Sequence, residues 1–191
     1  MRDRTIDMAQ PSPWVARFFG GIRQGGRVLD VACGGGRHLV LGAAAGRHMV
    51  GIDRDITQAR ANTLGLADVE VIEADLETGG VFPVRPAAFD GVVVTNYLWR
   101  PILPAIVACV AADGVLIYET FAAGNEKYGR PSNPQFLLQP SELVDAVATQ
   151  LRVVAFEYGF LPDPDRIVQR IVAVGFGHPW ALTGAPLNGD D

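Results

Sequence analysis

The chain has 191 residues, of which 49% are hydrophobic and 19% are charged, so one folded domain with a sizeable core is expected. The formal net charge is −5, and the basic residues are dispersed without a polybasic run. This distribution disfavours nucleic acid and anionic membranes as partners. Cys33 and Cys109 lie far apart in the chain, which argues against a disulfide framework and a structural zinc site, so no metal is expected.

The amino-terminal residues MRDRTIDMAQPSP lack the apolar core of a signal peptide. The most hydrophobic stretch, 102–118, is interrupted by Pro104 and Asp113, and it is shorter than the ~20 apolar residues of a membrane-spanning helix. We therefore expect a cytoplasmic protein with no membrane partner. The sequence leaves the oligomeric state open, a homodimer included.

The first half of the chain alternates between helical and extended patterns. A helix is expected over 11–22, with Ser12 as its N-cap and Pro13 in its first turn. Short apolar runs predict strands at 27–32, 48–53, 69–75 and 89–96, and helices are expected at 37–46 and 56–65. Strands of this kind suit a parallel sheet that is buried on both faces.

The second half adds a helix at 101–111 and a strand at 114–121, and a loop rich in Gly, Asn and Pro follows over 122–140. Ser141 is expected to cap a helix over 142–150. Strands at 151–160 and 166–176 are joined by the turn-rich link LPDPD, which suits a hairpin in which one late strand runs antiparallel. Residues 177–191 have no periodicity and are expected to form a tail.

This order of elements predicts an α/β fold with a doubly wound, mostly parallel sheet of seven strands and one antiparallel late strand. Ligands of such sheets bind beyond the carboxyl ends of the strands, where the strand order reverses. The stretch DVACGGGRH, residues 30–38, follows the first strand and is therefore expected at that crevice.

Two glycines and a carboxylate point to a nucleoside at this crevice. Gly34 and Gly36 directly follow the first strand, and Asp53 closes the second. This layout suits a nucleoside that lies over the glycines and has its ribose hydroxyls on the carboxylate.

The same stretch departs from a dinucleotide fingerprint, which needs a glycine where Leu39 stands. That fingerprint also leaves Asp30 and Asp75, at the ends of the first and third strands, without a role. No P-loop motif is present. An NAD(P)-dependent oxidoreductase and a non-catalytic nucleoside-binding domain remain the alternative functions.

Four segments, VLDVACGGGRH, VGIDRD, EAD and FDGVVVTN, resemble the successive motifs of the class I S-adenosylmethionine-dependent methyltransferases. The stretch YETF…NEKYGRPSNPQFLL is loosely similar to small bacterial methyltransferases of the tellurite-resistance type. The resemblance implies a Rossmann-like methyltransferase fold, S-adenosylmethionine as cofactor and a small-molecule acceptor of the methyl group. It also implies a single methyltransferase domain over 1–176, with 122–140 as the acceptor loop.

The resemblance further implies which residues hold the cofactor. The glycine loop would pass under its methionine and ribose, with Asp30 near the methionine amino group. Asp53 would accept the ribose hydroxyls, and Asp75 would accept the adenine amino group. The residues implied in cofactor binding are Asp30, Ala32, Cys33, Gly34, Gly36, Asp53, Arg54, Asp75, Leu76 and Asn96.

No catalytic residue is evident from the sequence. The candidates are Asn96, Tyr97 and His38. The candidates for contact with the acceptor are Trp14, Tyr97, Tyr128 and Arg130. Cys33 is more plausible as a small buried residue beside the cofactor than as a nucleophile, and His178 would reach the site only if the tail folded back.

Overall fold

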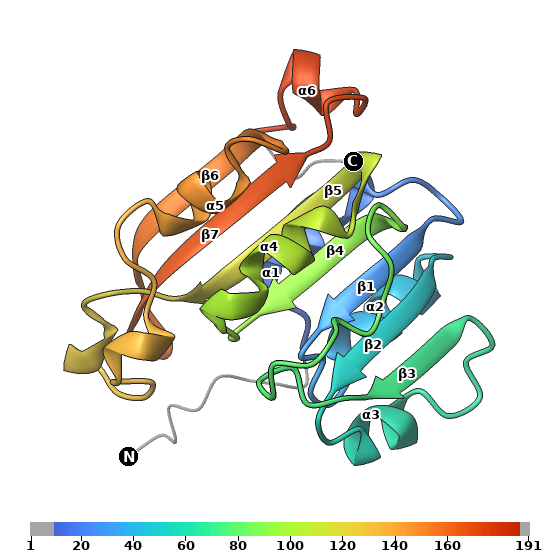
Figure 1. Ribbon diagram of the computed structural model, residues 1–191, viewed down its shortest axis with the longest axis horizontal. Coiled ribbons are helices and arrows are strands. Elements are labelled where there is room, and N and C mark those ends of the chain that lie inside the picture. The colour runs from blue at the N-terminus through green and yellow to red at the C-terminus, as the bar shows by residue number, and fades with distance from the viewer. Residues whose placement is uncertain (1–9, 188–191) are drawn as a thin grey trace.

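Residues 10–187 of the chain are described by a computed structural model, in which seven strands form one sheet (Figure 1). The strand order is β3-β2-β1-β4-β5-β7-β6, so the order reverses between β1 and β4. Neighbouring strands run parallel except for β7, which is antiparallel to both β5 and β6. The prediction of a doubly wound, mostly parallel sheet with one antiparallel late strand is confirmed.

The strands agree closely with the expected ranges. They are β1 (Arg27–Val31), β2 (His48–Asp53), β3 (Val69–Glu73), β4 (Phe89–Thr95), β5 (Val110–Phe121), β6 (Arg152–Leu161) and β7 (Arg166–Val174). The largest difference is at β5, which begins at Val110 rather than at 114. The preceding helix ends at Ala108, so the chain is free to pair Val110 with Phe89 of β4.

The helices are shorter than expected, and two of them adjoin a 3-10 turn at one end. They are α1 (Pro13–Phe18), α2 (Arg37–Ala44), α3 (Thr57–Asn62), α4 (Leu103–Ala108), α5 (Glu142–Val147) and α6 (Trp180–Thr183). The 3-10 turns are Phe19–Gly21, Arg100–Ile102, Asn125–Lys127 and Pro134–Phe136. No helix within 10–187 has the length and apolar character to cross a membrane.

The two expected helix caps have opposite outcomes. The Ser12 Oγ accepts hydrogen bonds from the backbone N–H groups of Trp14 and Val15, so this cap is confirmed. The prediction for Ser141 is wrong, because its backbone is left-handed and its side chain makes no capping bond. The Glu142 carboxylate holds this turn instead, since its Oε2 accepts the N–H of Gln139 at 2.7 Å.

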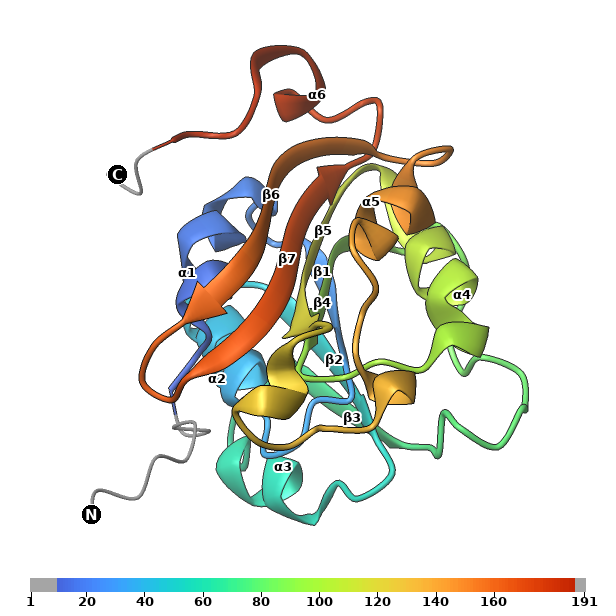
Figure 2. The same cartoon turned by 90° about the vertical axis from the view of Figure 1, so that its left-hand side faces the viewer.

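Helices cover both faces of the sheet, α1 and α2 on one side and α4 and α5 on the other (Figure 2). Leu29 of β1 belongs to the core beneath α4 and α5, whereas its neighbour Val28 belongs to the core beneath α1 and α2. Because successive side chains of a strand point to opposite faces of the sheet, β1 contributes to the hydrophobic core on both sides. The helices lie on the faces of the sheet, and the candidate site lies at the carboxyl ends of its parallel strands.

Candidate active site

A cavity of about 530 Å³ lies at the carboxyl ends of the parallel strands. Its lining residues follow β1 (Ala32), β2 (Asp53 and Arg54), β3 (74–77) and β4 (96–98), and the end of β5 (Thr120 and Phe121) and the loop behind it (Pro131 and Phe136) complete it. The volume falls within the ~300–1,000 Å³ that small-molecule sites usually have. The cavity therefore occupies the switch point that the strand order predicts.

The structure brings together six of the ten residues that were expected to bind a cofactor. These are Ala32, Asp53, Arg54, Asp75, Leu76 and Asn96, and Tyr97 lines the same cavity. The remaining four, Asp30, Cys33, Gly34 and Gly36, do not line it. They belong to the strand end and glycine loop on which it is built.

Asp53 links the second strand to the glycine loop. Its Oδ2 accepts a hydrogen bond from the Gly34 N–H at 2.8 Å, and its Oδ1 accepts one from the Asp55 N–H at 3.1 Å. A carboxylate offers about four acceptor positions, so two remain for groups in the cavity.

The two glycines singled out in the sequence have left-handed backbones, with φ of +53° at Gly34 and +80° at Gly36. Such conformations favour glycine because it has no Cβ. At Gly36 a Cβ would also lie 3.4 Å from Ala59 of α3. Gly36 thus serves the packing of two helices as well as the turn into α2.

Two residues that line the cavity have a strained backbone. Among the described residues, Ala32 and Asn96 are two of five non-glycine residues with positive φ, at 54° and 55°. Ala32 directly follows β1 and Asn96 directly follows β4, so they stand on the two sides of the switch point. Strain of this kind costs of order 1–3 kcal/mol per residue, and it clusters at functional sites.

Asp30, at the end of β1, is 1% exposed, and neither of its carboxyl oxygens has a hydrogen-bond partner within 10–187. Burial raises the pKa of this carboxyl to about 8, Arg37 opposes the shift, and Asp53 adds to it. The group is therefore mostly protonated at neutral pH. A buried carboxyl without a hydrogen-bond partner is rare in folded proteins, and such a group is suited to bind a ligand that carries a donor or a positive charge.

His38 is also 1% exposed, and its Nε2 accepts a hydrogen bond from the Ser12 N–H at 3.1 Å. Burial lowers the pKa of this imidazole to about 3, and the charge of Arg37 acts in the same direction. A ring nitrogen that is already engaged and hard to protonate does not suit a general base. His38 does not line the cavity, and its geometry is that of a structural residue.

Two further candidates are buried away from the cavity. The thiol of Cys33 has a raised pKa because of burial, followed by the charges of Asp30 and Asp53, so it is not a nucleophilic thiolate. Trp14 is 2% exposed, packs against Phe18 with 4.6 Å between ring centroids, and does not line the cavity. The expectation that Trp14 contacts an acceptor is not supported by this placement.

The loop over 122–140 does reach the cavity, but through other residues than expected. Pro131 and Phe136 line it, whereas Tyr128 and Arg130 do not. Tyr128 is 47% exposed and packs against Phe160 of β6. His178 does not fold over the site, because its Nε2 lies 3.0 Å from the carbonyl oxygen of Gly21, ahead of β1.

The turn after β4 carries a side chain with an unsatisfied polar group. The hydroxyl of Tyr97 is buried and has no partner within 10–187, and its pKa is raised by burial and then by Glu77. The Tyr118 hydroxyl donates to the Tyr97 carbonyl oxygen at 2.8 Å and fixes this turn. Thr120 and Phe121 were not predicted to line the site, although they lie at the carboxyl end of β5, at the same edge of the sheet as the other lining residues.

Residues 28–112 match the family model of the methyltransferase domain. No curated protein matches the chain. An S-adenosylmethionine-dependent methyltransferase from Aquifex aeolicus is 18% identical, with a TM-score of 0.60 over 86% of this chain and 94% of its own. A TehB-like S-adenosylmethionine-dependent methyltransferase from Corynebacterium glutamicum is 18% identical, with a TM-score of 0.60 over 85% of this chain and 87% of its own.

A third similar structure is the 1,6-didemethyltoxoflavin-N1-methyltransferase of Burkholderia thailandensis, with bound 1,6-didemethyltoxoflavin and S-adenosylhomocysteine. It is 16% identical, with a TM-score of 0.65 over 88% of this chain and 78% of its own. At such identities the solved structures establish the fold, which is the Rossmann-like fold expected from the sequence.

Proposed function

We propose that this chain, which carries a class I S-adenosylmethionine-dependent methyltransferase domain, methylates a small-molecule acceptor at the carboxyl edge of its sheet. The observation that carries the proposal is the presence of Asp53 and Asp75 in one cavity at the switch point. A carboxylate at the end of β2 can hold the ribose of either cofactor class, whereas a dinucleotide fingerprint explains neither Asp75 after β3 nor Leu39 in place of its third glycine. Asp75 and Leu39 therefore count against the oxidoreductase alternative.

The residues present fit the cofactor. We assign the ribose hydroxyls to the free acceptor positions of Asp53, and the adenine to Asp75 and the Leu76 backbone. Asp30 supplies a buried carboxyl that has no hydrogen-bond partner within 10–187, on the β1 side, where the resemblance implies the methionine amino group. Ala32 would pass beneath the cofactor as the first residue of the glycine loop.

S-adenosylmethionine supplies a methyl group on a sulfonium sulfur, which an acceptor nucleophile takes as the carbon–sulfur electron pair returns to sulfur. The protein's part is to orient the acceptor and exclude water. We assign this to Asn96 and Tyr97 after β4, and to the apolar wall of Phe121, Pro131 and Phe136. None of these side chains is a strong base, so the acceptor's proton, where it has one, is proposed to leave to solvent.

The proposal includes a cytoplasmic location and a small molecule rather than a nucleic acid as acceptor. The two cysteines are buried and free, which agrees with a reducing compartment. The net charge of −5 gives no electrostatic attraction for phosphate backbones.

Calorimetric titration with S-adenosylmethionine, S-adenosylhomocysteine and NAD tests the cofactor. We expect the first two to bind and NAD to give no heat. Transfer of labelled methyl groups to a panel of small phenols, thiols, amines and oxyanions tests turnover. Binding of the cofactor without transfer to any acceptor would favour the non-catalytic alternative, and binding of NAD alone would exclude the proposed site.

A further inference from the structure

A second cavity of about 220 Å³ adjoins the site and shares Asn96 with it. Its walls come from the segment 10–13, from Arg37 at the start of α2 and from Glu119 near the end of β5. The β6–β7 hairpin closes it with Asp163 and Arg166. Because Asn96 belongs to both cavities, a ligand in the second one lies next to the place where the methyl group is transferred.

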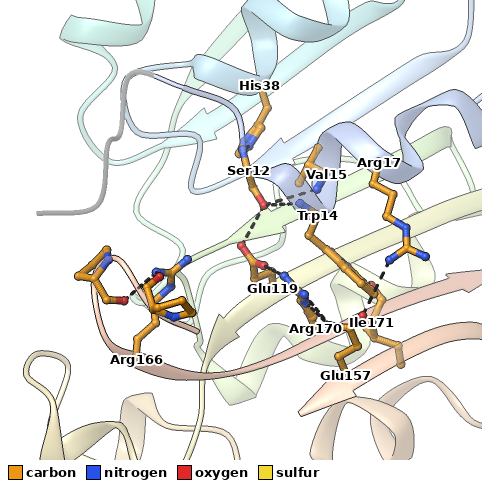
Figure 3. A network of polar contacts seen from close by, with 12 residues as sticks. Ser12, Trp14, Val15, Arg17, His38, Glu119, Glu157, Arg166, Arg170 and Ile171 are labelled. Carbon is orange, nitrogen blue, oxygen red and sulfur yellow. Dashed lines mark hydrogen bonds and ion pairs between the residues drawn. The ribbon is translucent and has the colours of Figure 1, made fainter. Parts of the chain in front are cut away.

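Arg166 lines this cavity, and only one nitrogen of its guanidinium is engaged within 10–187. Its Nη1 donates to the carbonyl oxygens of Pro164 at 2.9 Å and Pro162 at 3.5 Å, which fixes the guanidinium against the hairpin (Figure 3). Its Nε and Nη2 have no partner within 10–187, and no carboxylate of that range pairs with it. An arginine with a free fork of N–H groups in a cavity is suited to bind a carboxylate or another oxyanion.

The other arginine of the cavity, Arg37, is fixed by its surroundings. Its Nη1 donates to the Gln10 carbonyl oxygen at 3.1 Å, and its Nη2 lies 3.3 Å from the Thr95 hydroxyl. These contacts hold its positive charge on the α2 side of the cavity. Arg37 and Arg166 therefore provide two cationic groups from different elements.

The two acidic residues that line the cavity within 10–187 do not cancel this charge. Glu119 is buried, its Oε1 accepts the Ser12 hydroxyl at 2.9 Å, and its Oε2 is 3.5 Å from Nη1 of Arg170 (Figure 3). Its charge is thus satisfied within the protein. Asp163 is solvent-exposed, where water and salt screen its charge.

We propose that the second cavity binds an anionic group of the methyl acceptor, a carboxylate or another oxyanion, with Arg166 as the recognition residue. This inference rests on the proposed methyltransferase function and adds the class of its acceptor. The anionic group serves for recognition and takes no part in the transfer. The nucleophilic atom of the acceptor lies on the Asn96 side.

Matched pairs of acceptors test this inference with the full-length protein. The probes are 4-hydroxybenzoate with 4-hydroxybenzamide and 3-mercaptopropionate with 3-mercaptopropionamide. Both methyl transfer and calorimetric binding to the protein saturated with S-adenosylhomocysteine are measured. The variants are Arg166→Gln, Arg166→Lys and the control Arg152→Gln, which changes an exposed arginine at the other end of the same hairpin.

We expect the anionic member of at least one pair to be preferred about tenfold or more, as charge-assisted hydrogen bonds allow. Arg166→Gln should abolish the preference, Arg166→Lys should retain part of it, and Arg152→Gln should leave it unchanged. The affinity for S-adenosylhomocysteine should be the same in all four proteins, which also shows that the variants fold.

Three results would overturn the inference. Equal use of neutral and anionic probes excludes recognition of an anion, as does failure of every anionic probe to bind while S-adenosylhomocysteine still binds. A loss of S-adenosylhomocysteine affinity in folded Arg166→Gln would assign Arg166 to the cofactor's own carboxylate. If wild-type protein binds neither cofactor form, the proposed function itself fails.

Discussion

The backbone N–H of Ser12 donates to Nε2 of His38 at 3.1 Å, and this bond joins the start of α1 to the helix that follows the glycine loop (Figure 3). Since Nε2 accepts, the neutral ring carries its proton on Nδ1. That nitrogen lies 3.8 Å from Oδ2 of Asp30. The pKa of Asp30 is raised and that of His38 is lowered, so each residue leads to a separate prediction.

His38 should make the protein sensitive to acid. Its pKa is about 3 in the folded protein, against about 6.5 in an unfolded chain, so below pH 6.5 only the unfolded state takes up the proton. The stability that comes from the neutral ring is complete above pH 6.5 and is lost as the pH falls towards 3. At pH 5 the loss is about 2 kcal/mol. Urea unfolding of wild-type protein and His38→Gln at pH 7 and pH 5 measures this.

In that experiment the variant should be less stable than wild type at pH 7, and the difference should shrink by about 2 kcal/mol at pH 5. His48→Gln is the control, because this histidine is exposed on the surface and pairs with exposed Asp68. A difference that does not change with pH would mean that His38 titrates normally.

Asp30 should couple cofactor binding to release of a proton. Its pKa of about 8 keeps the carboxyl protonated at pH 7, whereas an ammonium group placed beside it would favour the carboxylate. We therefore expect S-adenosylhomocysteine to release up to one proton on binding between pH 6 and 7.5. Calorimetry in phosphate and Tris, whose ionisation enthalpies differ, measures the number of protons. Asp30→Asn should release none, and an identical heat in both buffers for wild type would refute the coupling.

Asp53 should contribute to cofactor affinity through its charge and its free acceptor positions. Asp53→Asn keeps one oxygen for the Gly34 N–H but removes the charge and an acceptor, at a cost of about 1–3 kcal/mol. We expect the Kd for S-adenosylhomocysteine to rise by about five- to 150-fold. Asp55→Asn, two residues further on and exposed, is the control. An unchanged Kd in Asp53→Asn would remove this residue from the site.

The carboxylates of the site were predictable because one rule of sheet geometry places them. Parallel strands end at the same edge, so Asp53 at the end of β2 and Asp75 after β3 must meet there. The same rule extends to Asn96 after β4. No long-range information was needed beyond the order of the elements.

The acceptor side was less predictable, because its side chains are oriented by contacts between distant segments. The turn-rich sequence of 122–140 predicts a loop, yet Arg100, 35 residues before Gln135, helps determine how this loop lies. The predicted cap at Ser141 was wrong for the same reason, because the neighbouring Glu142 carboxylate accepts a hydrogen bond from the distant Arg100. Trp14 shows a third case, because helical periodicity does not reveal whether an aromatic residue faces the core or a ligand.

Gly175, just after β7, should not tolerate a side chain. A Cβ there would lie 2.2 Å from the carbonyl oxygen of Ala112, a backbone atom of β5 that cannot rotate away. Gly175→Ala should therefore lower the free energy of unfolding by about 1–3 kcal/mol, as overpacking does. Urea unfolding measures it, with Gly159→Ala on β6 as the control because nothing lies within 4 Å of its added Cβ. Equal stabilities of the two variants would contradict the packing at Gly175.

Arg100 should determine the order of the acceptor loop. Its guanidinium donates to the carbonyl oxygens of Gln135 at 2.6 Å and Leu137 at 2.8 Å, and it forms a two-point pair with the Glu142 carboxylate. A lysine in its place keeps the charge but cannot make this set of bonds, because its ammonium is a single point rather than a planar fork.

We therefore expect Arg100→Lys to speed amide hydrogen exchange in 134–139, where Phe136 lines the cavity, without faster exchange in β1 and β4. The KM for an acceptor should rise, while the affinity for S-adenosylhomocysteine should change little, because within 10–187 Arg100 bonds to the segment 135–142 and not to Asp53 at the end of β2 or Asp75 after β3. Arg23→Lys is the matched control, since Arg23 makes a similar two-point pair with Asp90 near the start of β1. Faster exchange throughout the sheet would show that Arg100 stabilises the whole fold, and unchanged exchange in the loop would show that the 3-10 turns hold it unaided.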